Sequence, residues 1–289
     1  MLWTYLEQLI EYASSYSDEL IDAKSEYQKT AGQAYEDDRS YESQMAMFHE
    51  WFIFDRILPE TESTLLERML EDFEETWDHK QQEVYGGFRD NIFGLFRVKK
   101  LTPNEVTVEN LFDNEKHSVN ESEGRLMFNK GDLFQGRLLK YEEEKYFTRN
   151  FSIHPKGAFK FIETEIKSLL REEKPDIAKW KSICSEVDSL QSDLNKCHQK
   201  TAKIKEKILK AGNPDKQIKL EVERQELECN ARELDKKKAL SQAKQRRFKI
   251  ETFKVKFRTA HCELAHRMNY MKLKWERSRQ IDIRDIYKN

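Results

Sequence analysis

The feature that most constrains the fold is an apolar heptad repeat that runs from Trp180 to Ala211. Its ten core positions, spread over about five heptads, predict one arm of a coiled coil. Residues 211–215, with the sequence AGNPD, then favour a reversal of the chain, and a second apolar helix pattern follows them. We therefore expect a long antiparallel coiled-coil hairpin with its turn near residues 211–215.

The predicted seam of this hairpin is made of apolar and small side chains at facing positions of the two arms. Its residues are Trp180, Ile183, Val187, Leu190, Leu194, Cys197, Thr201, Ile204, Ile208, Leu220, Leu227, Ala231 and Leu234. A turn at Asn213 pairs residue i with roughly residue 426 − i, which places Cys197 opposite Cys229. We expect these two cysteines to lie together in the seam as reduced thiols.

Charge is sorted along the chain, although the formal net charge is only −2. Residues 1–86 carry 6 Lys and Arg against 21 Asp and Glu, a net of −15. Residues 171–289 carry 31 against 19, a net of +12. Blocks of opposite sign bind each other or bind partners of the opposite sign, and the sequence leaves both outcomes open.

The acidic segment has the apolar spacing of a helical bundle. Its expected helices cover residues 3–31, 38–58 and about 61–77, with Gly32 ending the first, Pro59 following the second, and Thr61 or Ser63 capping the third. The second helix holds the densest aromatic cluster, from Phe48 to Phe54. These side chains cover nearly the whole circumference of the helix, which predicts that it lies at the buried centre of the bundle.

From Phe93 the apolar pattern changes to a period of two, which is typical of strands. The expected strands cover residues 93–98, 106–112, 116–119, 133–141 and 145–151, with Gly131 and Gly136 permitting a turn and a bend. A connecting helix is expected near residues 157–173, ending before Pro175.

The fold class expected is mainly α with a small all-β domain. It combines an acidic helical bundle at residues 1–86, a five-stranded antiparallel barrel-like domain at 87–156, and a connecting helix with the coiled-coil hairpin at 157–289. The second hairpin helix outruns the first arm, and its distal half carries apolar residues on more than one face. We expect this distal half to pack back on residues 1–86.

Catalytic and metal-binding motifs are missing. The sequence contains no GxGxxG, GxxxxGK[ST], GxSxG or HExxH motif, and its four cysteines form no CxxC pair. His49, Glu50 and Asp55 do not share a face of the predicted helix, so we interpret them as separate polar side chains that form caps or reach solvent. His261 and His266 are five residues apart, which does not suit a metal pair. We expect no enzyme activity, no cofactor and no metal site.

A basic stripe on the distal helix is the candidate nucleic-acid surface, because residues 236–284 hold 16 Lys and Arg against 4 Asp and Glu. The candidate phosphate-binding residues are Lys236, Lys237, Lys238, Lys244, Arg246, Arg247, Lys249, Lys254, Lys256 and Arg258. The β-domain offers Lys99, Lys100, Arg137, Lys140, Phe147 and Arg149 for the same purpose. The other interpretations are a basic helix that faces the acidic bundle and a β-domain that is structural or binds protein.

The turn of the hairpin carries a further group of lysines. They are Lys205, Lys207, Lys210, Lys216 and Lys219, against Glu206 and Asp215. At about 1.5 Å per residue, this tip would lie roughly 50 Å from the base of the hairpin, where it could contact phosphate. A solvated turn explains the same residues.

Two segments of the chain resemble a bacterial pattern. One is the helix FHEWFIFDR at residues 48–56, and the other is the β segment formed by GLFRV at 94–98 and KGDLFQGRL at 130–138. They are similar to uncharacterised bacterial proteins that join a helical WF-x-FD segment to a small β-domain, over about residues 35–150. Some of those proteins carry a Cys-rich zinc knuckle that this chain lacks. The resemblance implies a bacterial cytoplasmic protein and supplies no mechanism.

The function expected from the sequence is a non-enzymatic scaffold or adaptor that acts on protein partners through the hairpin and the β-domain. The alternative is a nucleic-acid-binding protein that uses the basic helix 236–284, with or without the β-domain. No run approaches 18 apolar residues and the first 20 residues lack a basic region, so we expect neither a membrane span nor a secretory signal. We expect a cytoplasmic monomer or homodimer.

Overall fold

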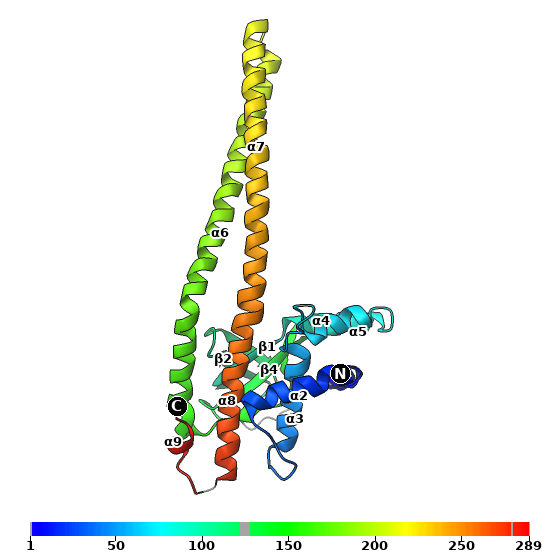
Figure 1. Ribbon diagram of the computed structural model, residues 1–289, viewed down its shortest axis with the longest axis vertical. Coiled ribbons are helices and arrows are strands. Elements are labelled where there is room, and N and C mark those ends of the chain that lie inside the picture. The colour runs from blue at the N-terminus through cyan, green and yellow to red at the C-terminus, as the bar shows by residue number, and fades with distance from the viewer. Residues whose placement is uncertain (1, 122–127, 279, 289) are drawn as a thin grey trace. The chain divides into compact units, whose positions relative to one another are not determined.

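The computed structural model describes residues 2–121, 128–278 and 280–288. The chain divides into two compact units. The first, which we call the body, comprises Met1–Arg171 and Phe257–Asn289, and the second, which we call the hairpin, comprises Glu172–Lys256. The expected fold class is confirmed, because long helices are combined with a small antiparallel sheet and a helical hairpin (Figure 1).

The body begins with a run of helices. They are α1 Leu2–Ala13, α2 Ser17–Ala31, α3 Tyr41–Phe54, α4 Leu65–Asp72 and α5 His79–Gly87, followed by the short η1 Phe88–Asp90. The prediction of one helix over residues 3–31 is wrong, because the chain leaves the helix between α1 and α2. The hydroxyls of Ser14 and Ser15 donate hydrogen bonds to the carbonyls of Ile10 and Tyr12, and such local bonds compete with the helical ladder.

The ends of α2 and α3 follow the local sequence. Gly32 ends α2 as predicted, with a φ of 69° that suits glycine. The predicted extension of the next helix to Leu58 is wrong, because α3 ends at Phe54 and Asp55 has a non-helical backbone with a φ of −120°. The side chain of Asp55 is therefore not placed by helical periodicity.

Capping boxes begin the next two helices. Thr64, and not Thr61 or Ser63, caps α4, where its hydroxyl accepts from the backbone N–H of Glu67. Asp78 caps α5 in the same way. Such caps satisfy backbone donors that the first turn of a helix leaves open.

Long helices follow the sheet. They are α6 Phe159–Lys210, α7 Pro214–Phe248, the π-helical stretch η3 Lys249–Phe257, α8 Arg258–Arg277 and the short α9 Ile283–Ile286, with η2 Lys156–Ala158 before α6. The prediction that a helix ends before Pro175 is wrong, because Pro175 lies inside α6. Proline leaves the carbonyl four residues earlier, that of Arg171, without its helical donor. Arg171 is also the last residue of the first body segment, so the gap in the hydrogen-bond ladder coincides with the unit boundary.

The sheet of the body is antiparallel and strongly curled. Its strands are β1 Ile92–Leu101, β2 Glu105–Asn110, β3 Lys116–Asn120, β4 Leu133–Tyr141, β5 Glu144–Phe147 and β6 Ser152–Ile153, in the order β3-β2-β1-β4-β5 with β6 paired to β4. The predicted strand 145–151 is divided between β5 and β6. The curl brings the edge strands together, since Asn120 donates to Glu144 across 2.6 Å.

Alternate residues of the strands face two different cores. Phe96 and Phe134 pack inside the curl with Phe147. Leu95 and Leu133 point to the opposite side, where they pack against the first turns of α6 and against α8. A third core, rich in aromatic side chains, lies among α1–α5, and the predicted burial of the aromatic cluster on α3 is confirmed.

Within the residues that the structure describes, every helix is too short or too polar to cross a membrane.

Candidate functional site

The two arms of the hairpin lie side by side (Figure 1). Leu194, Cys197 and Ala231 of the predicted seam pack together between them. The buried seam residues are Ile183, Val187, Leu194, Cys197, Thr201, Ile204 and Ala231, and the partly buried ones are Trp180, Leu190, Ile208, Leu220, Leu227 and Leu234. At the base, the ring of Trp180 contacts those of Phe248 and Phe253, with centroids 6.3 and 5.4 Å apart. The base is thus closed by aromatic side chains, whereas the middle of the seam depends on small ones.

The predicted pairing of two cysteines in the seam is wrong. Cys229 is exposed, whereas Cys197 is buried. Cys197 packs with Ala231 and Leu227, and its Sγ lies 3.2 Å from the carbonyl oxygen of Leu227. Leu227 and Ala231 are four residues apart and share one face of α7, so the residue midway between them points away from the seam.

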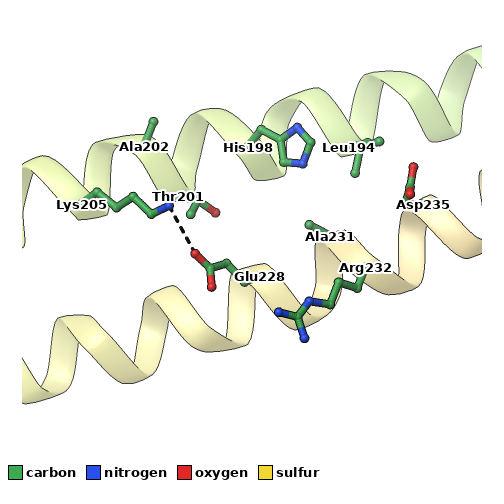
Figure 2. Close-up of a pocket in the computed structure, with 9 residues that line it drawn as sticks. All are labelled: Leu194, His198, Thr201, Ala202, Lys205, Glu228, Ala231, Arg232 and Asp235. Atoms are coloured by element: carbon green, nitrogen blue, oxygen red, sulfur yellow. Dashed lines mark ion pairs between the residues drawn. The ribbon is translucent and has the colours of Figure 1, made fainter.

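The middle of the seam opens into a groove of about 570 Å³, which we call the seam groove (Figure 2). It is lined by Leu194, His198, Thr201, Ala202 and Lys205 of α6 and by Glu228, Ala231, Arg232 and Asp235 of α7. The groove exists because Thr201, Ala202 and Ala231 are too short to fill the space between the arms. Lys205 and Glu228 form an ion pair across it, with Nζ and Oε1 3.4 Å apart. The arrangement is a shallow apolar floor with charged rims.

The ten predicted phosphate-binding residues fall on α7, η3 and the first residue of α8. Four of them form ion pairs: Lys244–Glu186 at 3.9 Å, Arg247–Glu251 at 2.6 Å, Lys256–Asp176 at 2.7 Å and Arg258–Asp55 at 2.9 Å. Of these four carboxylates, only Asp55 belongs to the acidic segment 1–86. Five residues of the stripe have no carboxylate partner in the described part of the chain: Lys236, Lys237, Lys238, Arg246 and Lys249.

The basic residues proposed for the β-domain do not line one exposed face. Arg137 and Phe147 are buried, so the prediction that they take part in a nucleic-acid surface is wrong. The side chains of Lys99 and Lys140 pair with Glu109 and Glu143. Arg137 is buried because its position on β4 makes it face the helices of the body, together with Leu133 and Leu139.

Arg137 is the centre of a buried ion cluster that the sequence did not predict. Its guanidinium makes a two-pronged contact with Asp55, and its Nε lies 3.4 Å from Glu50. Nε of Arg258 donates to Oδ1 of Asp55 across 2.9 Å, and Asn150 donates to Glu50 across 2.7 Å. The cluster joins α3, β4 and α8 within the body, and its two cations balance its two carboxylates.

Burial and charge move the two carboxyl groups of this cluster in opposite directions. Burial raises the pKa of Glu50, and the attraction of Arg137 only partly offsets this. Burial alone would raise the pKa of Asp55 as well, but Arg137 and Arg258 together outweigh it and hold that pKa below its usual value. Asp55 is therefore the fixed negative charge of the cluster.

Glu50 and Asp55 were interpreted as separate polar residues, and that interpretation is wrong. A helix that continued through residue 58 would point the two side chains apart. Because α3 ends at Phe54, Asp55 is free to turn toward the same guanidinium as Glu50. His49 does not join the cluster.

A row of polar side chains on α8 fastens this helix inside the body. The row consists of Arg258, Cys262, His266 and Asn269, at the spacing of one helix face. Asn269 exchanges hydrogen bonds with Gln44 at 2.7 and 3.0 Å. The ring of His266 lies 3.3 Å from the Thr30 hydroxyl. Polar residues at a spacing of four, four and three, beside the apolar residues Leu264, Ala265 and Met268, are the sequence signal that could have identified this row.

The body also has an open hollow of about 620 Å³, lined by Arg39, Ser40, Ser43, Lys272, Trp275 and Glu276. Glu276 pairs with Lys272 at 3.2 Å and accepts from Ser40 at 2.9 Å. The charge of Lys272 is thus balanced by Glu276, whereas Arg39 has no carboxylate partner among the described residues.

The two histidines of the C-terminal helix have packing roles. The ring of His261 stacks on Phe112 with centroids 4.1 Å apart, and His266 contacts the ring of Tyr27 at 4.5 Å. Across the described residues, no group of three or more His, Cys, Asp or Glu side chains is placed to hold a metal ion.

Comparison with known proteins found no match among curated proteins and none among solved structures. One family model matches the chain, over residues 7–185. The matched range contains the second half of α1, α2–α5, the whole sheet and the first part of α6, and it ends before the seam groove and the basic stripe. Because it covers more than half of the sequence, the chain belongs to this family, which is described as a family of unknown function (DUF7986).

Proposed function

We propose that the protein is a non-enzymatic adaptor whose hairpin binds an α-helix of a partner protein along the seam groove. The observation that supports this is the groove itself, which lies between the two arms of the hairpin and has an apolar floor. Amphipathic helices bind in apolar grooves of this kind, with residues at i, i+3, i+4 and i+7 as anchors. A partner helix would complete a three-helix arrangement that covers His198 and Ala202, which line the groove and are exposed.

The rims of the seam groove specify the partner further. His198 and Lys205 line the α6 side, whereas Glu228 and Asp235 line the α7 side together with Arg232. A complementary helix would therefore carry acidic residues beside α6 and basic residues beside α7, flanking its own apolar stripe. Charge of this kind sets orientation and partner choice more than affinity.

The test uses two exposed alanines as matched positions. Ala202→Trp places a large side chain in the seam groove, and Ala239→Trp makes the same change on α7 outside it. A photo-crosslinking residue at position 198 should label one helical segment of one partner, and Ala202→Trp should reduce that labelling at least tenfold. Equal labelling with both tryptophan variants would contradict the proposal.

A second candidate function, nucleic-acid binding, is favoured by one observation. Between residues 236 and 250 the chain has seven Lys and Arg and no Asp or Glu, and five of these cations have no carboxylate partner in the described part of the chain. The stretch from Lys236 to Lys249 is about 20 Å long at 1.5 Å per residue, which is enough to follow several phosphates.

Salt dependence separates this candidate from the adaptor. Five phosphate contacts to duplex DNA would give a slope of about −4.5 in log affinity against log salt. Replacing the five unpaired cations by Gln should remove this slope. The control is the same number of Gln replacements on α6 away from the tip, at Lys167, Lys174, Lys181, Lys196 and Lys200. Binding that both sets weaken equally would mean general charge attraction and no defined surface.

A cytoplasmic location and a second binding surface on the β-domain complete the adaptor proposal. The four cysteines are free thiols, which suits a reducing compartment. The β-domain exposes Leu101 at the end of β1 and Ile153 in β6. Replacing either residue by Asp should leave crosslinking at position 198 unchanged if the two surfaces act independently.

A further inference from the structure

The tip of the hairpin exposes aliphatic side chains that the adaptor surface does not use. Leu209 is 87% exposed, Ile218 is 63% exposed and Val222 is 50% exposed. Leu209 lies in the last turn of α6, and the other two share one face at the start of α7. We call these residues and the lysines around them the hairpin tip. Exposed aliphatic side chains that gather at one end of a helical hairpin are typical of an interaction surface.

The hairpin tip also carries unpaired positive charge. Residues 203–219 contain six Lys and two acidic residues, a net of +4. Lys205 pairs with Glu228, and the remaining five make no ion pair within the described residues: Lys203, Lys207, Lys210, Lys216 and Lys219. A partner for this tip must therefore combine an apolar contact with several carboxylates.

The chain itself carries a surface of that chemistry on α2. Ile21 is 70% exposed, and Asp18 and Asp22 lie beside it on the same helix face. Neither aspartate has a cationic partner in the part of the chain that the structure describes. The surrounding segment, residues 1–86, has a net charge of −15. We call Asp18, Ile21 and Asp22 the α2 face.

We propose that the hairpin tip of one copy docks on the α2 face of a second copy. Ile218 and Val222 would contact Ile21, and the lysines of the tip would pair with Asp18 and Asp22. This contact would bring together the acidic and basic blocks of two chains and would not involve the seam groove. The proposal therefore goes beyond the adaptor function. Because the two patches differ, each copy both donates a tip and accepts one, and association continues until it closes into a ring or a reciprocal pair.

Two features favour a protein surface over a lipid surface as the occupant. The hairpin tip has no aromatic residue between 203 and 222, whereas helices that lie in a membrane interface commonly use Trp or Phe as anchors. Nucleic acid would account for the lysines and would leave the three aliphatic side chains without a role. The α2 face supplies both the carboxylates and the apolar contact.

The experiment measures the average mass of the full-length protein by light scattering against concentration. Association should be evident at about 50 mM salt and should weaken at least tenfold at about 500 mM, because exposed ion pairs are screened there. A mass that stays monomeric at every concentration in low salt would overturn the proposal. The mass would also stay monomeric if the acidic and basic blocks paired within one chain, and that outcome likewise contradicts docking between copies.

Matched variants locate the contact. Ile218→Asp changes the hairpin tip, and Leu240→Asp makes the same change at a 72% exposed aliphatic residue elsewhere on α7. Ile218→Asp should weaken association at least tenfold, and Leu240→Asp and the groove variant Ala202→Trp should leave it unchanged. Equal losses with Ile218→Asp and Leu240→Asp would contradict the assignment.

Charge exchange supplies a gain of function that misfolding cannot imitate. Lys216→Glu with Lys219→Glu reverses the tip, and Asp18→Lys with Asp22→Lys reverses the α2 face. Each double variant alone should associate weakly, and a mixture of the two should form complexes that contain both chains. Failure of the mixture to associate, or tighter binding of the wild-type tip to phosphatidylserine vesicles than to a second copy, would overturn the proposal.

Discussion

The body and the hairpin bury very different amounts of apolar side chain. Among the described residues, 48 apolar side chains are buried in the body and 6 in the hairpin, although the hairpin contributes 85 of the 289 residues. The body therefore has cores of its own, whereas the hairpin depends on one narrow seam. Regions with few buried apolar contacts open at low free energy, and binding surfaces are commonly drawn from them.

The two regions also treat charge in opposite ways. In the body, Arg137 and Asp55 meet with their side chains 1% and 0% exposed. In the hairpin, the pair Lys205–Glu228 lies at the surface. Removing one partner of a buried pair leaves an uncompensated charge, whereas removing one partner of a surface pair leaves a charge in water. In the body, charged side chains pair in the interior and join separate elements, whereas in the hairpin they pair at the surface in contact with water.

The largest effect should come from Asp55→Asn in the body. The substitution leaves Arg137 and Arg258 against a single carboxylate that burial already disfavours, and breaking a buried pair in this way costs about 3–5 kcal/mol of unfolding free energy. Denaturant unfolding at neutral pH measures it. The control Asp37→Asn, at an exposed position of the same acidic segment, should change stability by less than about 0.5 kcal/mol. A loss below about 1 kcal/mol for Asp55→Asn would contradict the role of the cluster.

The next effect is a loss of body stability as the pH falls. Burial lowers the pKa of His266 from 6.5 to about 3, so the folded state resists a proton that the unfolded chain accepts. The group therefore contributes stability above pH 6.5 that is lost progressively between pH 6.5 and about 3. Between pH 6 and 4 this amounts to about 2–3 kcal/mol.

The variant His266→Gln should remove that share of the pH dependence, whatever it does to stability at neutral pH. The slope of unfolding free energy against pH is the quantity to compare. His198→Gln, at an exposed position of the hairpin, is the matched control and should leave the slope of the body unchanged. An unchanged slope in His266→Gln would mean that other buried groups, among them His154 with its pKa also near 3, carry the effect.

Much of the architecture could be predicted because periodicity is a local property. The strands around Phe96 and Phe134 and the seam around Leu194 each repeat an apolar residue at the spacing of one element. Periodicity gives the wrong helix boundaries where a single polar contact ends a helix, or where a helix continues through a residue that disfavours it. Ser14 and Ser15 interrupt a regular apolar stripe, and Pro175 does not interrupt its helix.

The candidate sites were harder to predict because they depend on contacts between distant parts of the sequence. Glu50, Arg137 and Arg258 are separated by 87 and 121 positions and meet only through the tertiary fold. The seam residues followed from the heptads, but the seam groove required the register that brings Thr201 near Ala231. Cys229 stays outside the seam because it points away from the face of α7 that carries Leu227 and Ala231.

A third prediction concerns the cohesion of the hairpin. Leu194→Ala removes one of the few buried side chains of the seam and should lower hairpin stability by about 2 kcal/mol, at the low end for such changes because the adjacent groove lets neighbours relax. Hydrogen exchange resolved by segment is the measurement. Protection should fall on both arms near the substitution and stay unchanged in α3 and β4. A uniform loss across both units would mean that they unfold as one cooperative structure.

The smallest effect tests the surface charge of the hairpin directly. The side chains of Lys205 and Glu228 are 55% and 32% exposed, and a double-mutant cycle with Lys205→Ala and Glu228→Ala should give a coupling energy of only about 0.2–1 kcal/mol. The coupling should shrink at high salt because both groups stay in contact with water. If it exceeds about 2 kcal/mol and resists salt, the pair is desolvated and the seam groove is narrower in solution. A partner helix would then have to break this pair before it could bind.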